Sequence, residues 1–116
     1  MGLGELERKV MDVLWDASGQ RLSGRDVADR IPDRAYTTVL TILDRLRRKK
    51  VVKRSNDGKT HVFAPVATRE SYTASLMLEP LGSASNRNAV LVRFAETVSA
   101  EEAAILRDAL DASRKG

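Results

Sequence analysis

The chain has 116 residues, of which 42% are hydrophobic and 4% aromatic. This length suits one ordinary domain or two small modules, and the apolar fraction excludes a disordered chain. The formal net charge of +4 is unevenly spread, because residues 1–67 carry 14 basic and 9 acidic side chains and residues 68–116 carry 6 and 7. The first part can therefore attract phosphate, while the second cannot.

The titratable residues argue against an enzyme or a metal site. The sequence contains no cysteine, which excludes disulfides, thiolate metal sites and cysteine nucleophiles. The only histidine, His61, falls in a predicted surface strand, and no glycine-rich phosphate loop, zinc-protease motif or nucleophile elbow occurs. We therefore expect no catalytic residues, no metal and no cofactor. The sequence also lacks a long apolar run and a signal-peptide core, so we expect a cytoplasmic protein that does not insert into a membrane.

Apolar residues at helical spacing predict a first helix over residues 5–15. A very short strand can follow at residues 21–22. Ser23, with Asp26 three residues later, is typical of a capping box and predicts the start of a second helix, which Pro32 then ends. The first 35 residues therefore predict two short helices joined by a turn.

The third predicted helix covers residues 36–50. Its apolar residues recur at the spacing of one helix face and are expected to lie in the core: Val39, Ile42, Leu43 and Leu46. The opposite face begins with threonines and ends in basic residues, and we expect Thr37 or Thr38 to cap the helix. Seven basic side chains lie within residues 45–54. One or two charges are enough to offset a helix dipole, so a basic run of this density favours a nucleic-acid contact over a merely solvated helix end.

Two short β-prone runs, residues 51–55 and 60–64, flank an Asp57-Gly58 turn and predict a hairpin with a basic tip. Three helices followed by a hairpin form the element order of a winged helix-turn-helix, whose third helix enters the DNA major groove. The residues that we expect to bind DNA are Thr37, Thr38, Thr41, Arg45, Arg48, Lys49, Lys53, Arg54 and Lys59. A winged helix used only as a protein-interaction adaptor is the alternative function.

Beyond residue 67 the sequence becomes mildly acidic and predicts three more helices, over residues 68–81, 89–98 and 100–112, with a loose tail from Ser113. We expect residues 1–67 to form the DNA-binding domain and residues 68–116 a helical dimerisation domain, because so small a module needs a partner surface. The residues expected at the interface are Tyr72, Leu76, Leu91, Phe94, Leu106 and Leu110. The alternative is that these helices pack onto the winged module of their own chain. The expected fold class is mainly α with a small β-hairpin.

Three stretches of sequence carry a family resemblance: LGELE with VMDVLW over residues 3–15, AYTTVLTILDRL over 35–46 and FAPV over 63–66. They resemble the BlaI/MecI penicillinase-repressor family of bacterial regulators, and the composition, rich in Arg, Ala, Val and Asp, resembles that of actinobacterial proteins. The resemblance implies a homodimeric repressor that binds a double-stranded DNA operator with dyad symmetry and controls β-lactam-response genes.

The resemblance also implies a way of releasing the DNA. Family members are typically cut in the dimerisation helices by a membrane-bound sensor protease, usually at an Asn-Phe bond. The matching bond here is Arg93-Phe94. Because arginine replaces the usual asparagine, a different release mechanism remains an alternative. The copper-responsive branch uses C-terminal cysteines, which this chain lacks.

Overall fold

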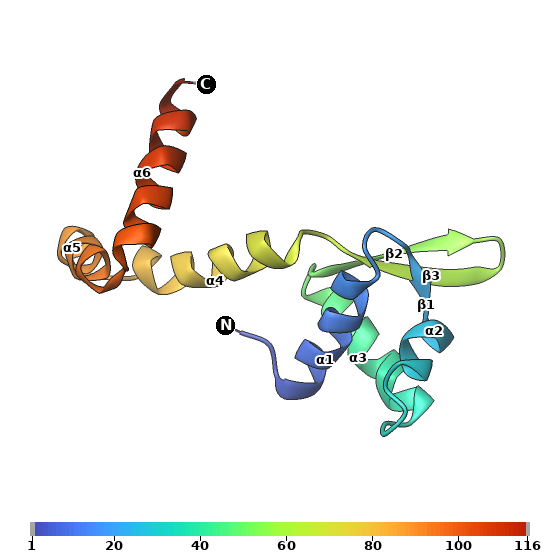
Figure 1. Cartoon of the computed structure of the whole chain (residues 1–116). Helices are drawn as coiled ribbons and strands as arrows, with labels where there is room; N and C mark the ends of the chain where they lie inside the picture. The colour runs from blue at the N-terminus through green and yellow to red at the C-terminus, as the bar shows by residue number, and fades with distance from the viewer. Residues whose placement is uncertain (1, 116) are drawn as a thin grey trace. The chain divides into compact units, whose positions relative to one another are not determined.

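The computed structural model describes residues 2–115, which form six α-helices and a three-stranded antiparallel sheet (Figure 1). Their bounds in chain order are α1 Glu5–Asp16, β1 Leu22–Ser23, α2 Gly24–Asp29, α3 Tyr36–Arg48, β2 Val52–Asp57, β3 Thr60–Pro65, α4 Arg69–Gly82, α5 Arg87–Thr97 and α6 Ala100–Lys115. The predicted class, mainly α with a small hairpin, is confirmed. The chain divides into two compact units, Met1–Leu76 and Met77–Gly116.

The N-terminal unit packs α1, α2 and α3 together beside the base of the sheet. The apolar faces of the three helices supply most of its core, and the sheet adds Leu22, Val52 and Phe63. The predicted core residues of α3 are confirmed, since each is at most 6% exposed: Val39, Ile42, Leu43 and Leu46. Because these four lie on one helix face, their burial leaves the opposite face of α3 at the surface.

The predicted cap of α2 is confirmed. Ser23 Oγ accepts a hydrogen bond from the backbone N–H of Asp26 at 3.0 Å, and Asp26 Oδ2 accepts one from the backbone N–H of Ser23 at 3.0 Å. The predicted cap of α3 is wrong. Ala35 occupies the N-cap position in an extended conformation without a side-chain hydrogen bond, so Thr37 and Thr38 fall inside the first helical turn.

The end of α3 is a Schellman motif. The backbone N–H of Val51 donates to Leu46 O at 3.1 Å, and that of Lys50 donates to Arg47 O at 3.0 Å. Lys50 has a φ of 65°, a left-handed conformation that glycine usually supplies at this position. The helix therefore ends at Arg48, two residues earlier than predicted, and the chain turns directly into β2.

Strand β3 lies in the middle of the sheet and pairs with β1 on one side and β2 on the other. Val52 pairs with Pro65 at the base of the hairpin, and Asp57 pairs with Thr60 at its tip. The two-residue loop is therefore Gly58-Lys59, with Gly58 at a φ of 67°, and the predicted position of Asp57 in the turn is wrong. Glycine at the first loop position, with Lys59 outside the left-handed region, fits a type II′ turn. Figure 1 shows the hairpin projecting beyond the three helices.

The helices beyond the winged module are held by local caps. Thr68 Oγ1 accepts from Ser71 N at 3.1 Å at the start of α4, and Ser99 forms the predicted capping box with Glu102. Helix α5 begins at Arg87, before its predicted start, because Asn86 Oδ1 accepts from Ala89 N at 3.0 Å. The tail predicted to be loose continues α6 to Lys115. No residue of α4 or α5 is buried.

Candidate nucleic-acid interface

The exposed face of α3 carries the threonines of the predicted reading surface. Thr37, Thr38 and Thr41 are all exposed, and Thr41 Oγ1 donates to the backbone oxygen of Thr37 at 3.0 Å. This bond uses the hydroxyl proton of Thr41 within the helix. Its methyl group and oxygen lone pairs remain available for the thymine methyl and for base-edge donors in a major groove.

Farther along the same helix, the basic residues are partly neutralised by one acid. Asp44 Oδ1 lies 2.7 Å from Arg47 Nη2, and Asp44 Oδ2 lies 2.9 Å from Arg48 Nη2. The hydrogen bond from Arg47, helped by the charges of Arg48 and Arg54, lowers the pKa of Asp44 below its ordinary value of 3.8. Asp44 therefore stays ionised and competes with any phosphate for these two guanidinium groups.

Lys49 has a partner that is distant in sequence. Its Nζ lies 2.8 Å from Glu7 Oε2, and the other carboxylate oxygen of Glu7 accepts from the backbone N–H of Gly4 at 2.9 Å. Glu7 is 6% exposed, and it is the one charged residue buried in the described part of the chain. The hydrogen bond from Lys49 lowers the pKa of Glu7, and the backbone hydrogen bond from Gly4 and the charges of Lys49 and Arg45 lower it further, although burial raises it. Lys49, which we predicted to contact DNA, thus forms an ion pair that joins the start of α1 to the end of α3.

The wing carries three basic residues that form no ion pair with a carboxylate. Lys53, Arg54 and Lys59 are exposed, and no ion pair engages them within residues 2–115. His61 is exposed on the neighbouring strand, where its Nδ1 lies 2.7 Å from Asn56 Oδ1. The wing and α3 together present a basic surface of the kind that neutralises phosphates beside a groove.

Two further arginines near this surface were missed by the sequence analysis. The Arg25 guanidinium lies 4.1 Å from the ring centroid of Tyr36, which joins the starts of α2 and α3. Arg21 donates to Ser55 Oγ at 3.3 Å and so reaches the wing from the segment before β1. Arg25 lies two residues after the Ser23 cap, in the first turn of α2, and its contact with Tyr36 places it beside the start of α3.

The close approach of α2 to α3 depends on Gly24. A Cβ atom at this position would lie 2.5 Å from Leu40 Cδ2. Only glycine leaves room for Leu40 in its present rotamer, and the short separation fixes the two helices of the helix-turn-helix against each other.

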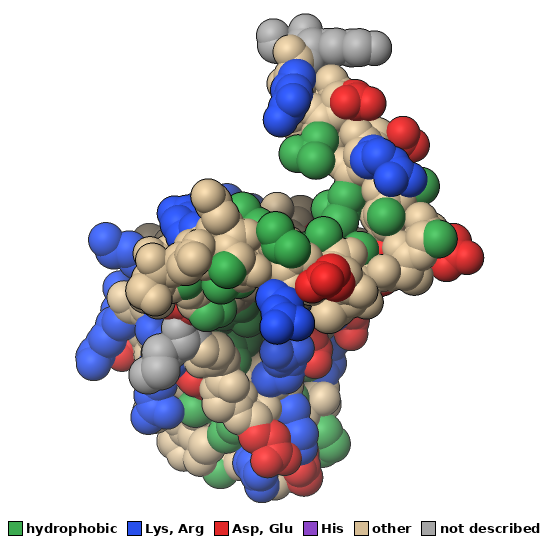
Figure 2. All heavy atoms as spheres, turned by 90° about the vertical axis from the view of Figure 1, so that its left-hand side faces the viewer, with side chains coloured by type: hydrophobic (Ala, Val, Ile, Leu, Met, Phe, Trp, Pro, Cys, Tyr) green, Lys and Arg blue, Asp and Glu red, His purple; other side chains and the backbone are tan. Residues whose placement is uncertain are grey.

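The residues predicted for dimerisation lie mainly on exposed apolar surface. Phe94 is 39% exposed and Leu106 41%, and Leu91 and Leu110 are more exposed still. Figure 2 shows hydrophobic side chains at the surface of α6. Leu76 is half-buried, and Tyr72 packs against Trp15 of α1 with ring centroids 5.7 Å apart. Both residues of the predicted cleavage bond, Arg93 and Phe94, lie inside α5 and are exposed.

The chain matches the family described as penicillinase repressor over residues 3–112. The chain belongs to the penicillinase repressor family. It is 43% identical to the transcriptional regulator BlaI of Mycobacterium tuberculosis H37Rv over 114 residues, which cover 93% of this chain and 82% of that protein. The predicted family is therefore confirmed, and an actinobacterial relative agrees with the expected origin. Membership makes the chain a DNA-binding transcriptional repressor.

Two solved structures support the winged-helix fold. One is MepR, a transcription regulator of the Staphylococcus aureus multidrug efflux pump MepA, with a TM-score of 0.53 and 17% identity over 97% of this chain and 78% of MepR. The other is the PcaV transcriptional regulator from Streptomyces coelicolor, with a TM-score of 0.51 and 19% identity over 98% of this chain and 76% of PcaV. At these identities the likeness establishes the fold alone. Among residues 2–115, no helix has the length and apolarity needed to cross a bilayer.

Proposed function

We propose that this penicillinase-repressor family member acts as a homodimer that binds a pseudo-palindromic operator through α3 and the wing. The observation that carries the proposal is the division of α3 into a buried apolar face and an exposed face of threonines, beside a wing whose cations are free of carboxylates. A helix of this kind can enter the major groove while the wing contacts the flanking phosphates.

Within this surface the residues have different tasks. Thr37, Thr38 and Thr41 read base edges and thymine methyl groups, and their loss should reduce discrimination between sequences. Lys53, Arg54 and Lys59 neutralise phosphates, and their loss should weaken binding to all sequences alike. Arg48 can join them only when Asp44 releases it, since the two side chains are paired at 2.9 Å.

The dimer is proposed to form through α4, α5 and α6. These helices leave large apolar side chains exposed, including Leu91, Phe94 and Ile105. Exposed apolar area of this kind destabilises a monomer in water, whereas a second copy of the same helices can cover it with a self-complementary surface. Two reading helices held in this way would meet successive major grooves about one DNA turn apart.

The DNA part of the proposal is tested by selecting duplexes from a random pool with the purified protein and titrating the selected operator at several salt concentrations. A dimer making roughly 8 phosphate contacts should show a log–log slope near −7. Thr38→Ala and Thr41→Ala should narrow the affinity gap between operator and random DNA, with Lys53→Ala as the control that weakens both equally. An adaptor without specific DNA binding would yield no enriched sequence and only weak attraction to duplexes.

Release is proposed to involve a membrane-bound sensor protease acting in the cytoplasm on the dimerisation helices. The bond that matches the family site is Arg93-Phe94, and both residues are exposed in α5. Cleavage there needs the helix to open locally, because a protease binds its substrate in an extended form. Mass spectrometry of the protein recovered from β-lactam-treated cells tests this step, since an N-terminal fragment ending at Arg93 is expected. An intact chain on released DNA would indicate a different signal.

A further inference from the structure

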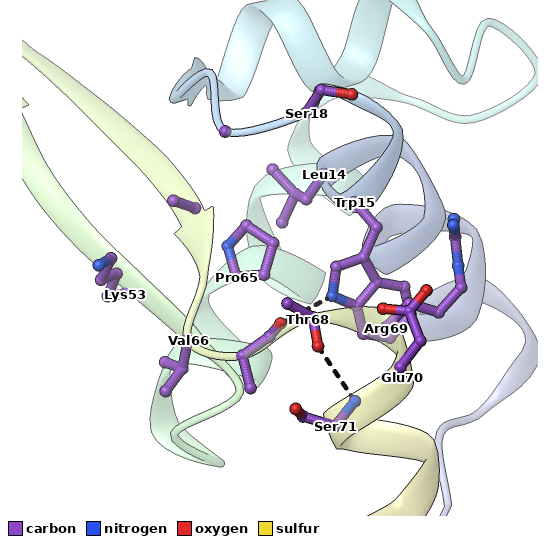
Figure 3. Close-up of a pocket in the computed structure, with 13 residues that line it drawn as sticks. Leu14, Trp15, Ser18, Lys53, Pro65, Val66, Thr68, Arg69, Glu70 and Ser71 are labelled. Carbon is purple, nitrogen blue, oxygen red and sulfur yellow. Dashed lines mark hydrogen bonds between the residues drawn. The ribbon is translucent and has the colours of Figure 1, made fainter. Parts of the chain in front are cut away.

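The first turn of α4 contacts the end of α1. The side chains that make this contact, which we call the latch, are Asp12, Trp15, Asp16, Arg69 and Tyr72. The Trp15 Nε1–H group donates to the backbone oxygen of residue 67 at 3.0 Å, and the rings of Trp15 and Tyr72 lie 5.7 Å apart. The guanidinium carbon of Arg69 lies 5.3 Å from the centroid of the Trp15 ring. Figure 3 shows Trp15, Thr68 and Arg69 together at the pocket beside this junction.

Arg69 adds two ion pairs to the latch. Its Nη2 lies 2.9 Å from Asp16 Oδ1 and 3.5 Å from Asp12 Oδ1, two carboxylates one helical turn apart on α1. The hydrogen bond to Asp16 and the charges of both carboxylates raise the pKa of Arg69 above its ordinary value. Each contact is exposed and weak alone, but they share Trp15 and Arg69, and a network holds its members more firmly than an isolated surface pair does.

The connection between β3 and α4 leaves little freedom beside the latch. The backbone N–H of Val66 donates to Val51 O at 2.9 Å, the backbone oxygen of residue 67 accepts from Trp15, and Thr68 caps the helix. Each of the three residues between the strand and the helix is thus held by a hydrogen bond. The latch side chains and the hydrogen bonds of the connecting backbone therefore both fix the first turn of α4 to the winged module.

None of these side chains is required by the reading surface described above. Trp15 and Asp12 are only half-buried, at the edge of the core, and Arg69 and Asp16 are exposed. A winged module could fold and present α3 without them. Their common effect is on the direction in which α4, which continues to Gly82, leaves the module.

We propose that the latch sets the half-site spacing that the repressor accepts. The inference rests on the proposed dimer, in which α4 belongs to the helices that join the two copies. One added base pair moves a half-site by about 3.4 Å and rotates it by roughly 35°. A stiff junction suits one spacing, whereas a loose junction accepts several at lower affinity because the second module must be ordered on binding.

The test compares spacing preference among matched variants. The operator selected by the wild-type protein is prepared at its own spacing, with two base pairs inserted at its centre, and as a single half-site. Wild-type protein should bind the native spacing roughly 100-fold more tightly than the lengthened operator. Arg69→Ala and Tyr72→Ala should reduce that ratio to roughly tenfold while leaving half-site affinity unchanged. Glu70→Gln, a change in the same helical turn outside the latch, should behave as wild type.

A separate readout reports whether the latch has opened. Trp15 is the only tryptophan in the chain, so its emission should shift to longer wavelength in Tyr72→Ala as the ring becomes hydrated. Arg69→Lys, which keeps the charge, should restore part of the spacing preference.

Three outcomes would overturn the inference, and they are distinguishable. A wild-type spacing profile in Arg69→Ala and Tyr72→Ala, with the Trp15 emission shifted, would show that the junction does not determine spacing. A wild-type protein that binds the dyad no better than a half-site would reject the dimer itself, and with it the basis of the inference. Loss of half-site binding in both variants would show instead that the latch supports the reading surface, which also contradicts the proposal.

Discussion

Replacing Lys49 by alanine should destabilise the winged module more than it weakens DNA binding. Lys49 lies within the basic run of residues 45–54, yet its Nζ is 2.8 Å from Glu7 Oε2. Glu7 itself is 6% exposed, and its other oxygen is occupied by the Gly4 N–H group. Removing Lys49 therefore leaves a carboxylate oxygen in a buried position without a donor.

The expected cost follows from the burial of the two partners. Leaving a buried polar group without its hydrogen bond costs about 1–3 kcal/mol. The 3–5 kcal/mol typical of breaking a fully buried ion pair is too large here, because 45% of the Lys49 side chain is exposed and water can enter once it is removed. We expect a loss of about 1–2 kcal/mol, which for a unit of this size lowers the melting temperature by roughly 4–16 °C.

The assay is thermal and urea unfolding, with Lys53→Ala as the control because it removes the same charge from an exposed site without an ion pair. Lys49→Ala should cost far less in a Glu7→Gln background, since glutamine keeps the capping bond to Gly4 and needs no cation. For DNA, Lys53→Ala should flatten the salt slope by about 1, and Lys49→Ala should leave it unchanged. Equal melting temperatures for the two variants would refute the reasoning.

The pH dependence supplies an independent check on the same pair. Lys49 lowers the pKa of Glu7 below its ordinary value of 4.5, so the folded state holds the proton less tightly than the unfolded chain does. This contribution to stability is complete above the unfolded pKa, near 4.5, and is lost as the pH falls through the lower folded value. The difference in stability between wild type and Lys49→Ala should therefore shrink below about pH 4, and a constant difference down to pH 2 would contradict the assignment.

Three further changes test other parts of the molecule. Asp44→Asn should release Arg47 and Arg48, raise affinity for all DNA sequences and steepen the salt slope by about 1–2, as measured by anisotropy titration. Lys50→Asn should raise the free energy of unfolding by up to about 1 kcal/mol in urea titrations, because Lys50 has a left-handed φ that asparagine tolerates better, and Lys50→Ala should show no such gain. Phe94→Asp should raise the dimer dissociation constant roughly 30-fold or more in sedimentation experiments, because it buries a charge without a partner.

The parts of the fold that depend on local sequence could be predicted. The apolar face of α3 follows from spacing alone, since any helix over these residues places Val39, Ile42, Leu43 and Leu46 on one side. The capping boxes at Ser23 and Ser99 depend on residues only three positions apart, and both formed as predicted. The element order of the winged helix followed from these local signals.

The errors arose where two local signals compete. Ala35 occupies the N-cap position, two residues before Thr37, so α3 begins two residues earlier than a cap at Thr37 would allow. In the hairpin, both Asp57-Gly58 and Gly58-Lys59 can form a two-residue turn, and the pairing of Asp57 with Thr60 selected the second. That register depends on how β3 pairs with both of its neighbours, which the turn sequence alone does not contain.

Contacts between distant residues could not be predicted at all. The partners in Lys49–Glu7 are separated by 42 positions and those in Arg69–Asp16 by 53. The sequence contains 16 acidic residues, and composition does not show which of them pairs with Lys49 or with Arg69. The tertiary fold selects the pairs, and it thereby assigns Lys49, a member of the basic run, to a contact between α1 and α3.

This reassignment changes where the charge for DNA binding lies. The sequence concentrates basic residues at the end of α3, but Arg47 and Arg48 share Asp44, and Lys49 is held by Glu7. Of the seven cations in residues 45–54, Arg45, Lys50, Lys53 and Arg54 have no ion pair in the described chain. We expect phosphate neutralisation to fall chiefly to these four residues and to Lys59 of the hairpin loop, while Asp44 reduces the net charge that α3 brings to the groove. A reading helix whose arginines are partly neutralised by Asp44 adds less nonspecific attraction, and this raises the share of the binding free energy that depends on sequence.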